Sequence, residues 1–419
     1  MPHSLSNTFS LLASLITDTE ALKSVQGEAR YLAKALGLID NQFELTANDA
    51  IDLSNLFKVA SKLKIFQSIP NPTAPGLKSF VACVDPEEFG FSREQFDEFD
   101  VAGVGLNALN ALRSCLGEAV EHLSLVERVG DLADGLFHRK LPPLLPIESE
   151  DQILGKSLLT DELVLLPADL CLVRLSYREH PEWQIGSGAA AGLTENEAEC
   201  RSVLELIERD AVANWWWNEN QARSISLEDT SNFGIEGFVK KIRGDRKDRS
   251  HHLLDIRGEV DLPVIAAFSF DKYGRQFAIG FSAHPSAQTA IRRALREMVQ
   301  METGLKILEL KTRKLGAEML SAADMRLHHR ANKVSAQHSK LKTRFKANFS
   351  GSERKLMSMS TIERILKKKI QKAHCEIATV NMTRQEYGVC VKKSYSNNLI
   401  HVPHFEGLSV LDDDIIPLS

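Results

Sequence analysis

Pairs of glutamates at helical spacing are the part of this sequence best suited to chemistry. Glu118 and Glu121 lie in LGEAVEHLS, and Glu205 and Glu208 lie in LELIERDA. Residues three positions apart lie on one side of a helix, about 4.5 Å apart along its axis. Because apolar residues flank the second pair, burying these carboxylates would require cations, and Mg²⁺ accepts carboxylate oxygens while leaving positions for phosphates. The four glutamates therefore predict a magnesium site able to hold a nucleoside triphosphate.

A third segment, IRRALREMVQ, carries Arg293 and Glu297 on one side of an expected helix. The planar guanidinium group of Arg293 is suited to binding phosphate oxygens. The sequence contains no GxxxxGK[ST] loop, no kinase HRD or DFG set, and no HExxH, GxSxG or dinucleotide-binding glycine motif. Nucleotide binding through metal ions is therefore one interpretation. The alternative is a solvated helix face with surface ion pairs, which is common at such spacings.

The composition is that of an ordinary globular protein. Of the 419 residues, 43% are hydrophobic and 26% are charged, and the formal net charge is −5. No apolar run approaches the roughly 18 residues of a membrane-spanning helix, and the N-terminus lacks the basic residues of a secretory signal. The six cysteines form no CxxC pair, which argues against a zinc ribbon. We therefore expect a cytoplasmic protein with reduced thiols and no membrane partner.

Periodicity and turn residues indicate helices and strands in an α+β or α/β arrangement, with helices packed on sheet. Residues 1 to about 65 are expected to be mostly helical, and a Pro-rich break follows at residues 69–76. Further helices are expected at residues 107–124, 194–217 and 286–310. Strands are expected at residues 79–84, 163–166, 170–175, 264–270, 277–281, 375–380 and 389–393. No internal repeat of fixed period is evident, although a loop of Gly or small residues, such as 186–192, precedes each carboxylate-bearing helix.

A basic stretch lies between Lys340 and Lys372, with eleven Lys or Arg against Glu353 and Glu363. It fits a solvated helical face, and the alternative is a surface for polyphosphate, nucleic acid or an acidic peptide. Because the stretch contains few aromatic rings on which bases could stack, we do not expect a nucleic-acid partner.

The segment from Ile185 to Trp217 strongly resembles the YcaO family. Members carry a small-residue loop, an acidic step, and a LELIERDA helix with a Trp-rich end. Here these are the loop Ser187–Gly192, the step Glu197–Ala198 and the helix that ends at Trp217. The agreement is long and specific.

Other segments match the family in the same order. Residues 103–121 resemble its first glutamate helix, and residues 280–300 resemble the block in which an Arg and a Glu line the nucleotide site. Residues 376–403 resemble its closing part more weakly. The resemblance covers about residues 60 to 419, so we predict a small N-terminal helical region over residues 1–65 and a YcaO-like ATP-binding catalytic domain over 66–419. The C-terminus, DDDIIPLS, lacks the Pro-rich tail of many azoline-forming members.

The resemblance implies an α+β fold, a YcaO-type core of mixed sheet packed with helices, that binds ATP and Mg²⁺. It implies catalytic roles for Arg293 and Glu297. The metal ligands would be Glu118, Glu121, Glu205 and Glu208. The implied nucleotide-binding residues are Gly103, Gly105, Glu118, Glu121, Glu197, Arg201, Glu205, Glu208, Arg293 and Glu297.

Family members activate a backbone amide by phosphorylating its oxygen. The resemblance thus implies a cyclodehydratase that converts Cys, Ser or Thr of a ribosomally made precursor peptide, such as that of a bacteriocin, to thiazolines or oxazolines. Formation of a thioamide or amidine, and a non-catalytic peptide-binding or nucleic-acid adaptor role, are the alternatives. Besides the precursor peptide, a separate partner protein is implied, either E1-like and leader-binding or sulfur-delivering, and a homodimer stays open.

Overall fold

The computed structural model divides the chain into two compact units. It describes residues 2–40, 45–93, 97–133, 138–143, 150–174, 186–217, 222–226, 230, 233–343, 345–347 and 357–400. The first unit contains the described residues of Met1–Ile69, Lys78–Leu206 and Cys375–Val402. The second unit contains Pro70–Leu77 and those within Ile207–His374.

Helices open the first unit, as expected, and side chains cap their ends. They are α1 (Pro2–Leu15), α2 (Thr19–Ser24), α3 (Gly27–Ala35) and α4 (Ala47–Ala60). Asp18 accepts hydrogen bonds from the amides that begin α2, and Thr46 and Asp49 form a capping box at the start of α4. Such caps satisfy amides that have no partner inside the helix.

These N-terminal helices share a hydrophobic core with the sheet that follows them. Phe9 of α1 contacts Phe57 of α4 and Phe66 of β1, with ring centroids 5.6 and 5.0 Å away. Phe66 in turn stacks on Phe80 of β2, with centroids 5.0 Å apart. The aromatic contacts therefore connect the N-terminal helices to the first sheet.

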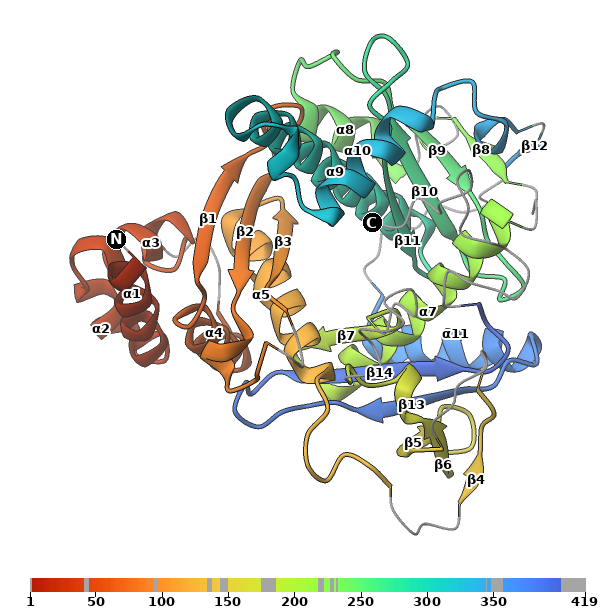
Figure 1. Ribbon diagram of the computed structural model, residues 1–419, viewed down its shortest axis with the longest axis horizontal. Helices are drawn as coiled ribbons and strands as arrows, with labels where there is room; N and C mark the ends of the chain where they lie inside the picture. Colours follow the sequence, from red (N-terminus) through yellow and green to blue (C-terminus); the bar gives the residue numbers. More distant parts are fainter. Residues whose placement is uncertain are drawn as a thin grey trace. The chain divides into compact units, whose positions relative to one another are not determined.

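The first sheet has the order β1-β2-β3, formed by β1 (Ile65–Pro70), β2 (Lys78–Val84) and β3 (Phe99–Gly105). Strands β2 and β3 run antiparallel, with Phe80 opposite Gly103. Helix α5 (Ala108–Leu125) packs against β2 and β3 (Figure 1).

A mixed six-stranded sheet completes the first unit, in the order β4-β6-β5-β13-β14-β7. Its strands are β4 (Arg139–Lys140), β5 (Gln152–Ser157), β6 (Leu163–Pro167), β7 (Ala189–Gly192), β13 (Ile377–Asn381) and β14 (Cys390–Ser396). Strands β4 and β6 are parallel, whereas the other neighbours are antiparallel. The pairing brings the end of the chain's described part next to the small residues of β7.

The second unit is built on a five-stranded sheet of order β11-β10-β9-β8-β12. Its strands are β8 (Arg223–Ile225), β9 (His252–Asp255), β10 (Val264–Ser269), β11 (Ala278–Ala283) and β12 (Phe345–Lys346). Helix α9 (Ala287–Leu315) packs against β10 and β11 (Figure 1). All residues of these two strands are buried, which fits their continuous apolar sequences.

Other helices link or flank these sheets. Helix α7 (Glu195–Trp217) begins in the first unit and ends in the second. The second unit also contains α8 (Ile235–Arg243), α10 (Ala322–Lys333) and α11 (Met359–Lys372). Short 3₁₀ helices are η1 (Pro86–Phe89), η2 (Ala168–Leu170), η5 (Ala317–Met319) and η6 (Ser339–Leu341).

The architecture confirms the expected α+β fold with mixed sheets. Two local expectations were wrong. Residues 170–174 of the expected strand 170–175 contain the end of η2 and an isolated bridge at Val173, because a short apolar run predicts burial without specifying a strand. The second half of the expected loop at 186–192 is strand β7, which pairs with β14.

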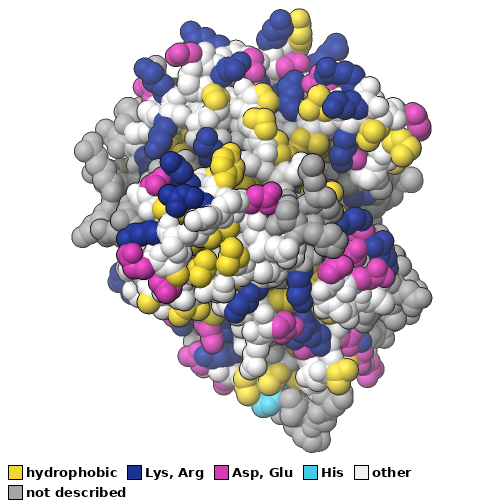
Figure 2. Space-filling model, turned by 90° about the vertical axis from the view of Figure 1, so that its left-hand side faces the viewer, with side chains coloured by type: hydrophobic (Ala, Val, Ile, Leu, Met, Phe, Trp, Pro, Cys, Tyr) yellow, Lys and Arg dark blue, Asp and Glu magenta, His cyan; other side chains and the backbone are white. Residues whose placement is uncertain are grey.

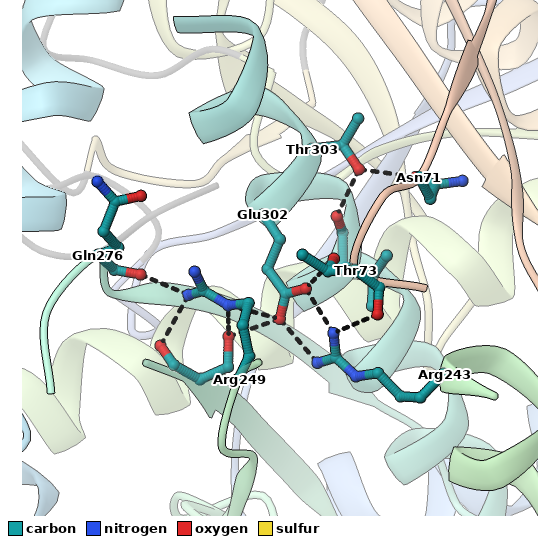
Figure 3. Close-up of polar contacts among 9 residues, drawn as sticks. Asn71, Thr73, Arg243, Arg249, Gln276, Glu302 and Thr303 are labelled. Carbon is teal, nitrogen blue, oxygen red and sulfur yellow. Dashed lines mark hydrogen bonds and ion pairs between the residues drawn. The ribbon is translucent and has the colours of Figure 1, made fainter. Parts of the chain in front are cut away.

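A buried ion-pair network anchors the Pro-rich segment 70–77 in the second unit (Figure 3). The Glu302 carboxylate accepts hydrogen bonds from both terminal nitrogens of Arg243 at 2.6 and 2.7 Å, and from Thr73 Oγ1 at 2.5 Å. Ser269 and Arg249 contact the same carboxylate, at 2.6 and 3.2 Å. Burial alone would raise the pKa of Glu302, but Arg243 and Arg249 hold it below the usual value.

The described part of the basic stretch fits a solvated helix face. Helix α11 buries Ile362, Leu366 and Ile370, while Lys367 pairs with Glu363 and Lys369 with Asp261 on its polar side. On the face drawn in Figure 2, Lys and Arg side chains are spread among Asp and Glu.

Within the described residues, no helix combines the length and apolar character needed to cross a membrane.

Replacing Phe57 by Ala should destabilise the protein by about 3–5 kcal/mol, because a fully buried ring is lost from the core that joins the N-terminal helices to the sheet. Urea unfolding followed by circular dichroism measures the change. The exposed Tyr31 of α3 provides a control, and Tyr31→Ala should change stability by less than about 0.5 kcal/mol. A loss below about 1 kcal/mol for Phe57→Ala would show that the N-terminal helices contribute little to this core.

Candidate functional site

The first glutamate pair lies on α5, which follows β3 after a tight connection. The side chain of Asn107 caps α5 by accepting a hydrogen bond from the Asn110 amide at 2.8 Å. Glu118 Oε2 accepts a hydrogen bond from the Ala102 amide of β3 at 2.9 Å. A Cβ at Gly103 would lie 2.2 Å from the backbone nitrogen of Cys115, so only glycine allows strand and helix to approach this closely.

Gly105, the second predicted glycine of the nucleotide site, is also buried against α5. A Cβ there would lie 2.5 Å from the Ala111 nitrogen. Packing against the helix therefore accounts for both glycines, and their predicted contact with the nucleotide stays a prediction.

Glu121 lies one turn after Glu118 and faces strand β7. Its Oε1 accepts a hydrogen bond from the Ala191 amide at 2.6 Å. Burial raises the pKa of Glu121 to about 8, and the negative charges of Glu205 and Glu118 act in the same direction, against Arg201. The first unit thus places three of the predicted acids close enough to repel one another.

Helix α7 supplies two further predicted residues at its first turns. Thr194 caps the helix by accepting from the Glu197 amide at 3.2 Å. The Glu197 carboxylate accepts from the Leu193 amide at 3.0 Å and pairs with Arg201 at 2.5 Å. Arg201 Nη1 also donates to the Ala191 carbonyl at 3.2 Å. Glu197 and Arg201 therefore tie the start of α7 to the end of β7.

In the second unit, strand β11 holds Glu208 and Glu297. Glu208 Oε2 accepts a hydrogen bond from the Ala283 amide at 3.1 Å, and Glu297 Oε2 accepts from the Phe281 amide at 2.7 Å. The side chain of Ser286 caps α9 by accepting from the Thr289 amide at 3.3 Å. A single strand of the second unit thus positions a glutamate from α7 and another from α9.

Arg293 lies near a buried histidine, His284, that no motif in the sequence indicated. Burial lowers the pKa of His284 to about 4, and the positive charge of Arg293 acts in the same direction. The Ser286 amide donates to His284 Nδ1 at 2.9 Å, so His284 is neutral at physiological pH. His284 lies two residues before the cap of α9, whereas glycines lie two residues before the caps of α5 and α7. This departure from glycine is the sequence signal that could have identified His284.

The three carboxylate-bearing helices share one local design. Each follows a strand and a capping residue, and a glutamate stands eleven positions after the cap: Glu118 after Asn107, Glu205 after Thr194, and Glu297 after Ser286. Fourteen positions after the caps, the residues are Glu121, Glu208 and Gln300. Seven positions after the caps, they are Ser114, Arg201 and Arg293. Arg201 and Arg293 are therefore equivalent, a relation that becomes visible only once the caps are located.

The interpretation of these acids as a solvated helix face does not fit the structure. The five glutamates of this shared design are all partly buried. Strand amides donate to four of them, Glu118, Glu121, Glu208 and Glu297.

Among the residues that the structure describes, no group of three or more His, Cys, Asp and Glu side chains is gathered closely enough to hold a metal ion. The Mg²⁺ assignment of Glu118, Glu121, Glu205 and Glu208 therefore stays a prediction. Its chemistry nevertheless fits, because the donors are carboxylate oxygens, which Mg²⁺ accepts as ligands.

The aromatic end of α7 is packed in the core. Trp215 and Trp216 are buried, with ring centroids 5.3 Å apart in an edge arrangement, and Trp216 stacks on His338 at 5.2 Å. Packing of a helix end therefore explains these two rings.

The chain belongs to the YcaO family. The family model, described as a YcaO cyclodehydratase that binds ATP and Mg²⁺, matches residues 102–396, which is well over half of the chain. This finding confirms the resemblance and the expected ATP and Mg²⁺ cofactors. The matched range contains every predicted site residue.

Related proteins agree at the level of the fold. An uncharacterized protein of Methanothermobacter thermautotrophicus is 26% identical over 216 residues, spanning 48% of this chain and only 56% of its own length. The structure of YcaO from Methanopyrus kandleri bound with AMPPCP and Mg²⁺ has a TM-score of 0.59 at 19% identity, covering 80% of this chain and 86% of its own.

Two further structures show the same fold. A heterocyclase in complex with substrate and cofactor has a TM-score of 0.61 at 21% identity, covering 82% of this chain and 50% of its own. The Escherichia coli microcin synthetase McbBCD complex with pro-MccB17 bound contains a chain with a TM-score of 0.55 at 13% identity, covering 80% of this chain and 88% of its own.

Helix α4 connects the N-terminal region electrostatically to the predicted nucleotide-binding residues. Asp52 Oδ2 lies 3.3 Å from Arg113 Nε of α5. Burial raises the pKa of Asp52 to about 6; Arg113 and Arg201 oppose the shift, whereas Asp49 and Glu197 add to it. The charge of Asp52 is therefore felt at the start of α7.

Asp52 should make stability depend on pH in a defined window. The folded state retains the Asp52 proton up to about pH 6, whereas the unfolded state loses it near pH 4, so ionisation destabilises the fold as pH rises through this window. Relative to the wild type, Asp52→Asn should therefore gain about 2 kcal/mol between pH 4 and pH 7. Urea unfolding at a series of pH values measures this gain.

The control is Asn55→Ala, on the same helix. Asn55 donates a hydrogen bond to the Gly388 carbonyl at 2.8 Å and does not titrate, so this variant should differ from the wild type by an amount that does not vary with pH. A pH-independent difference for Asp52→Asn as well would contradict the assigned pKa.

Proposed function

We propose that this chain uses ATP and Mg²⁺ to activate a backbone amide of a peptide by phosphorylating the amide oxygen. The observation that carries the proposal is the group of partly buried acids Glu118, Glu121 and Glu205, two of which are held by strand amides inside the family match. The family description as a cyclodehydratase supports ring formation from Cys, Ser or Thr as the reaction. The precursor peptide is the proposed substrate.

The proposed reaction balances without a protein nucleophile. A Cys, Ser or Thr side chain adds to the preceding carbonyl carbon, and the former carbonyl oxygen takes the γ-phosphoryl group of ATP, leaving ADP. Loss of that oxygen as phosphate then forms the C=N bond of a thiazoline or oxazoline. The peptide thus loses the elements of water, and phosphorylation supplies the leaving group that an amide oxygen lacks.

The chain's own residues would divide the work. Glu118, Glu121, Glu205 and Glu208 would hold Mg²⁺, which neutralises phosphate charge when bound. Arg293 would stabilise the transferring phosphoryl oxygens. Glu297, fixed by the Phe281 amide, would orient its neighbours on α9. Glu197, Arg201, Gly103 and Gly105 are proposed nucleotide contacts.

The proposed partners follow the same reasoning. We propose a separate partner protein, either E1-like and leader-binding or sulfur-delivering, and the cytoplasm as the location. The microcin synthetase is a complex with pro-MccB17 bound, which supports a peptide substrate and a partner protein. The homodimer stays a prediction. The C-terminal tail, without the Pro-rich motif, lies outside the described residues.

Glu121→Gln and Glu205→Gln should each weaken Mg²⁺-dependent ATP binding by at least about 10-fold, because each removes a charged oxygen from the predicted metal ligands. Calorimetric titration of folded variants with ATP and MgCl₂ measures the affinity. Glu236 is exposed in the first turn of α8, so Glu236→Gln should bind like the wild type. Wild-type affinity in both site variants would mean that these glutamates are not ligands.

Reaction of the chain with precursor peptide, partner protein and ATP should give a product about 18 Da lighter for each ring, with phosphate released. Mass spectrometry and a phosphate assay measure both outcomes. A product about 16 Da heavier in the presence of sulfide would instead indicate exchange of oxygen for sulfur and favour the thioamide alternative. ATP hydrolysis without any change in peptide mass, with every partner and nucleophile, would contradict amide activation.

A further inference from the structure

A buried lysine lies behind the acids of the first unit. Lys393, on strand β14, has no exposed surface, and its Nζ donates a hydrogen bond to the Ser187 carbonyl. Burial lowers the pKa of Lys393, whereas Cys171 and Glu205 act in the opposite direction. An ammonium group is rarely buried without a purpose, because its removal from water is costly.

The lysine belongs to a set of contacts that hold the small-residue loop before β7. The amide of the next residue, Ser394, donates to the Gly188 carbonyl at 2.7 Å. Its hydroxyl group also lies 2.7 Å from that of Ser202, one turn before Glu205 on α7. Two consecutive residues of β14 thus fix both this loop and the helix that carries Glu205.

The neighbouring lysine on β14 provides a comparison. Lys392 projects to the other side of the strand, as successive residues of a strand do, and pairs with the exposed Glu195 at 2.9 Å. Lys392 and Lys393 therefore share a side-chain type and a strand, but Lys393 is the one that donates to the loop before β7.

We propose that Lys393 is a positioning residue for nucleotide binding, which holds Glu205 and the Ser187–Gly188 loop in the arrangement that Mg²⁺ and ATP require. Lys393 and Ser394 both bond to the loop, and the Ser394 hydroxyl group also contacts that of Ser202, one turn before Glu205. These contacts fix the loop and the turn of α7 that precedes Glu205 before any metal ion binds. The inference rests on the proposed function of these glutamates.

Lys393→Met removes the donor to the Ser187 carbonyl, whereas Lys393→Gln keeps a donor on a side chain that is one bond shorter and does not reach as far. Both should bind ATP in the presence of Mg²⁺ at least about 10-fold more weakly than the wild type. With ATP fixed, they should also need more Mg²⁺ for half-saturation. Loss of a positive charge alone would lower that Mg²⁺ requirement, so an increase reports lost positioning of Glu205.

Calorimetric titrations at a temperature well below unfolding, with circular dichroism to confirm the fold, give these values. Lys392→Met should bind like the wild type. The proposal would be overturned if a folded Lys393 variant bound ATP like the wild type or needed less Mg²⁺ for half-saturation. If Lys393→Met does not fold, the measurement on Lys393→Gln decides. Failure of the wild type itself to bind ATP with Mg²⁺ would contradict the proposed function rather than the role of Lys393.

Discussion

The burial of carboxylates close to one another is the constraint on which the rest of the candidate site depends. Glu121 accepts a strong backbone hydrogen bond, which should favour its charged form, yet its pKa is raised to about 8. Burial and neighbouring acids therefore outweigh the hydrogen bond. A fold that only needed stability would not gather such groups, which is why the acids indicate a binding function.

The fold meets this constraint by fixing each acid to a strand. A capped helix follows a strand closely enough for a glutamate to reach a strand amide sixteen residues earlier, as with Glu118 and Ala102 and again with Glu297 and Phe281. Glycines permit the close approach: a Cβ at Gly103 or at Gly280 would lie 2.2 Å from a helix nitrogen. The same strand–helix geometry thus appears in both units.

Local spacing was sufficient to predict the acids and their helices, because helix periodicity and capping are properties of short segments. Their partners could not be predicted in this way. The Ala191 amide lies seventy residues from Glu121, and Lys393 lies far from Glu205 in sequence. Strand pairing brings them together. For the same reason, β7 was mistaken for a loop, since its alanines gain their strand partner only from β14.

The equivalent positions of the three helices suggest how the chemistry is divided. At seven, eleven and fourteen residues after the cap, α5 has Ser114, Glu118 and Glu121, α7 has Arg201, Glu205 and Glu208, and α9 has Arg293, Glu297 and Gln300. The formal charge of these positions therefore rises from −2 through −1 to 0. On α9, the amide of Gln300 keeps hydrogen-bonding capacity and avoids a like-charge pair with Glu297 one turn earlier. Net negative charge at these positions is thus greatest on α5, whereas α7 and α9 each carry an arginine, a side chain suited to binding phosphate oxygens.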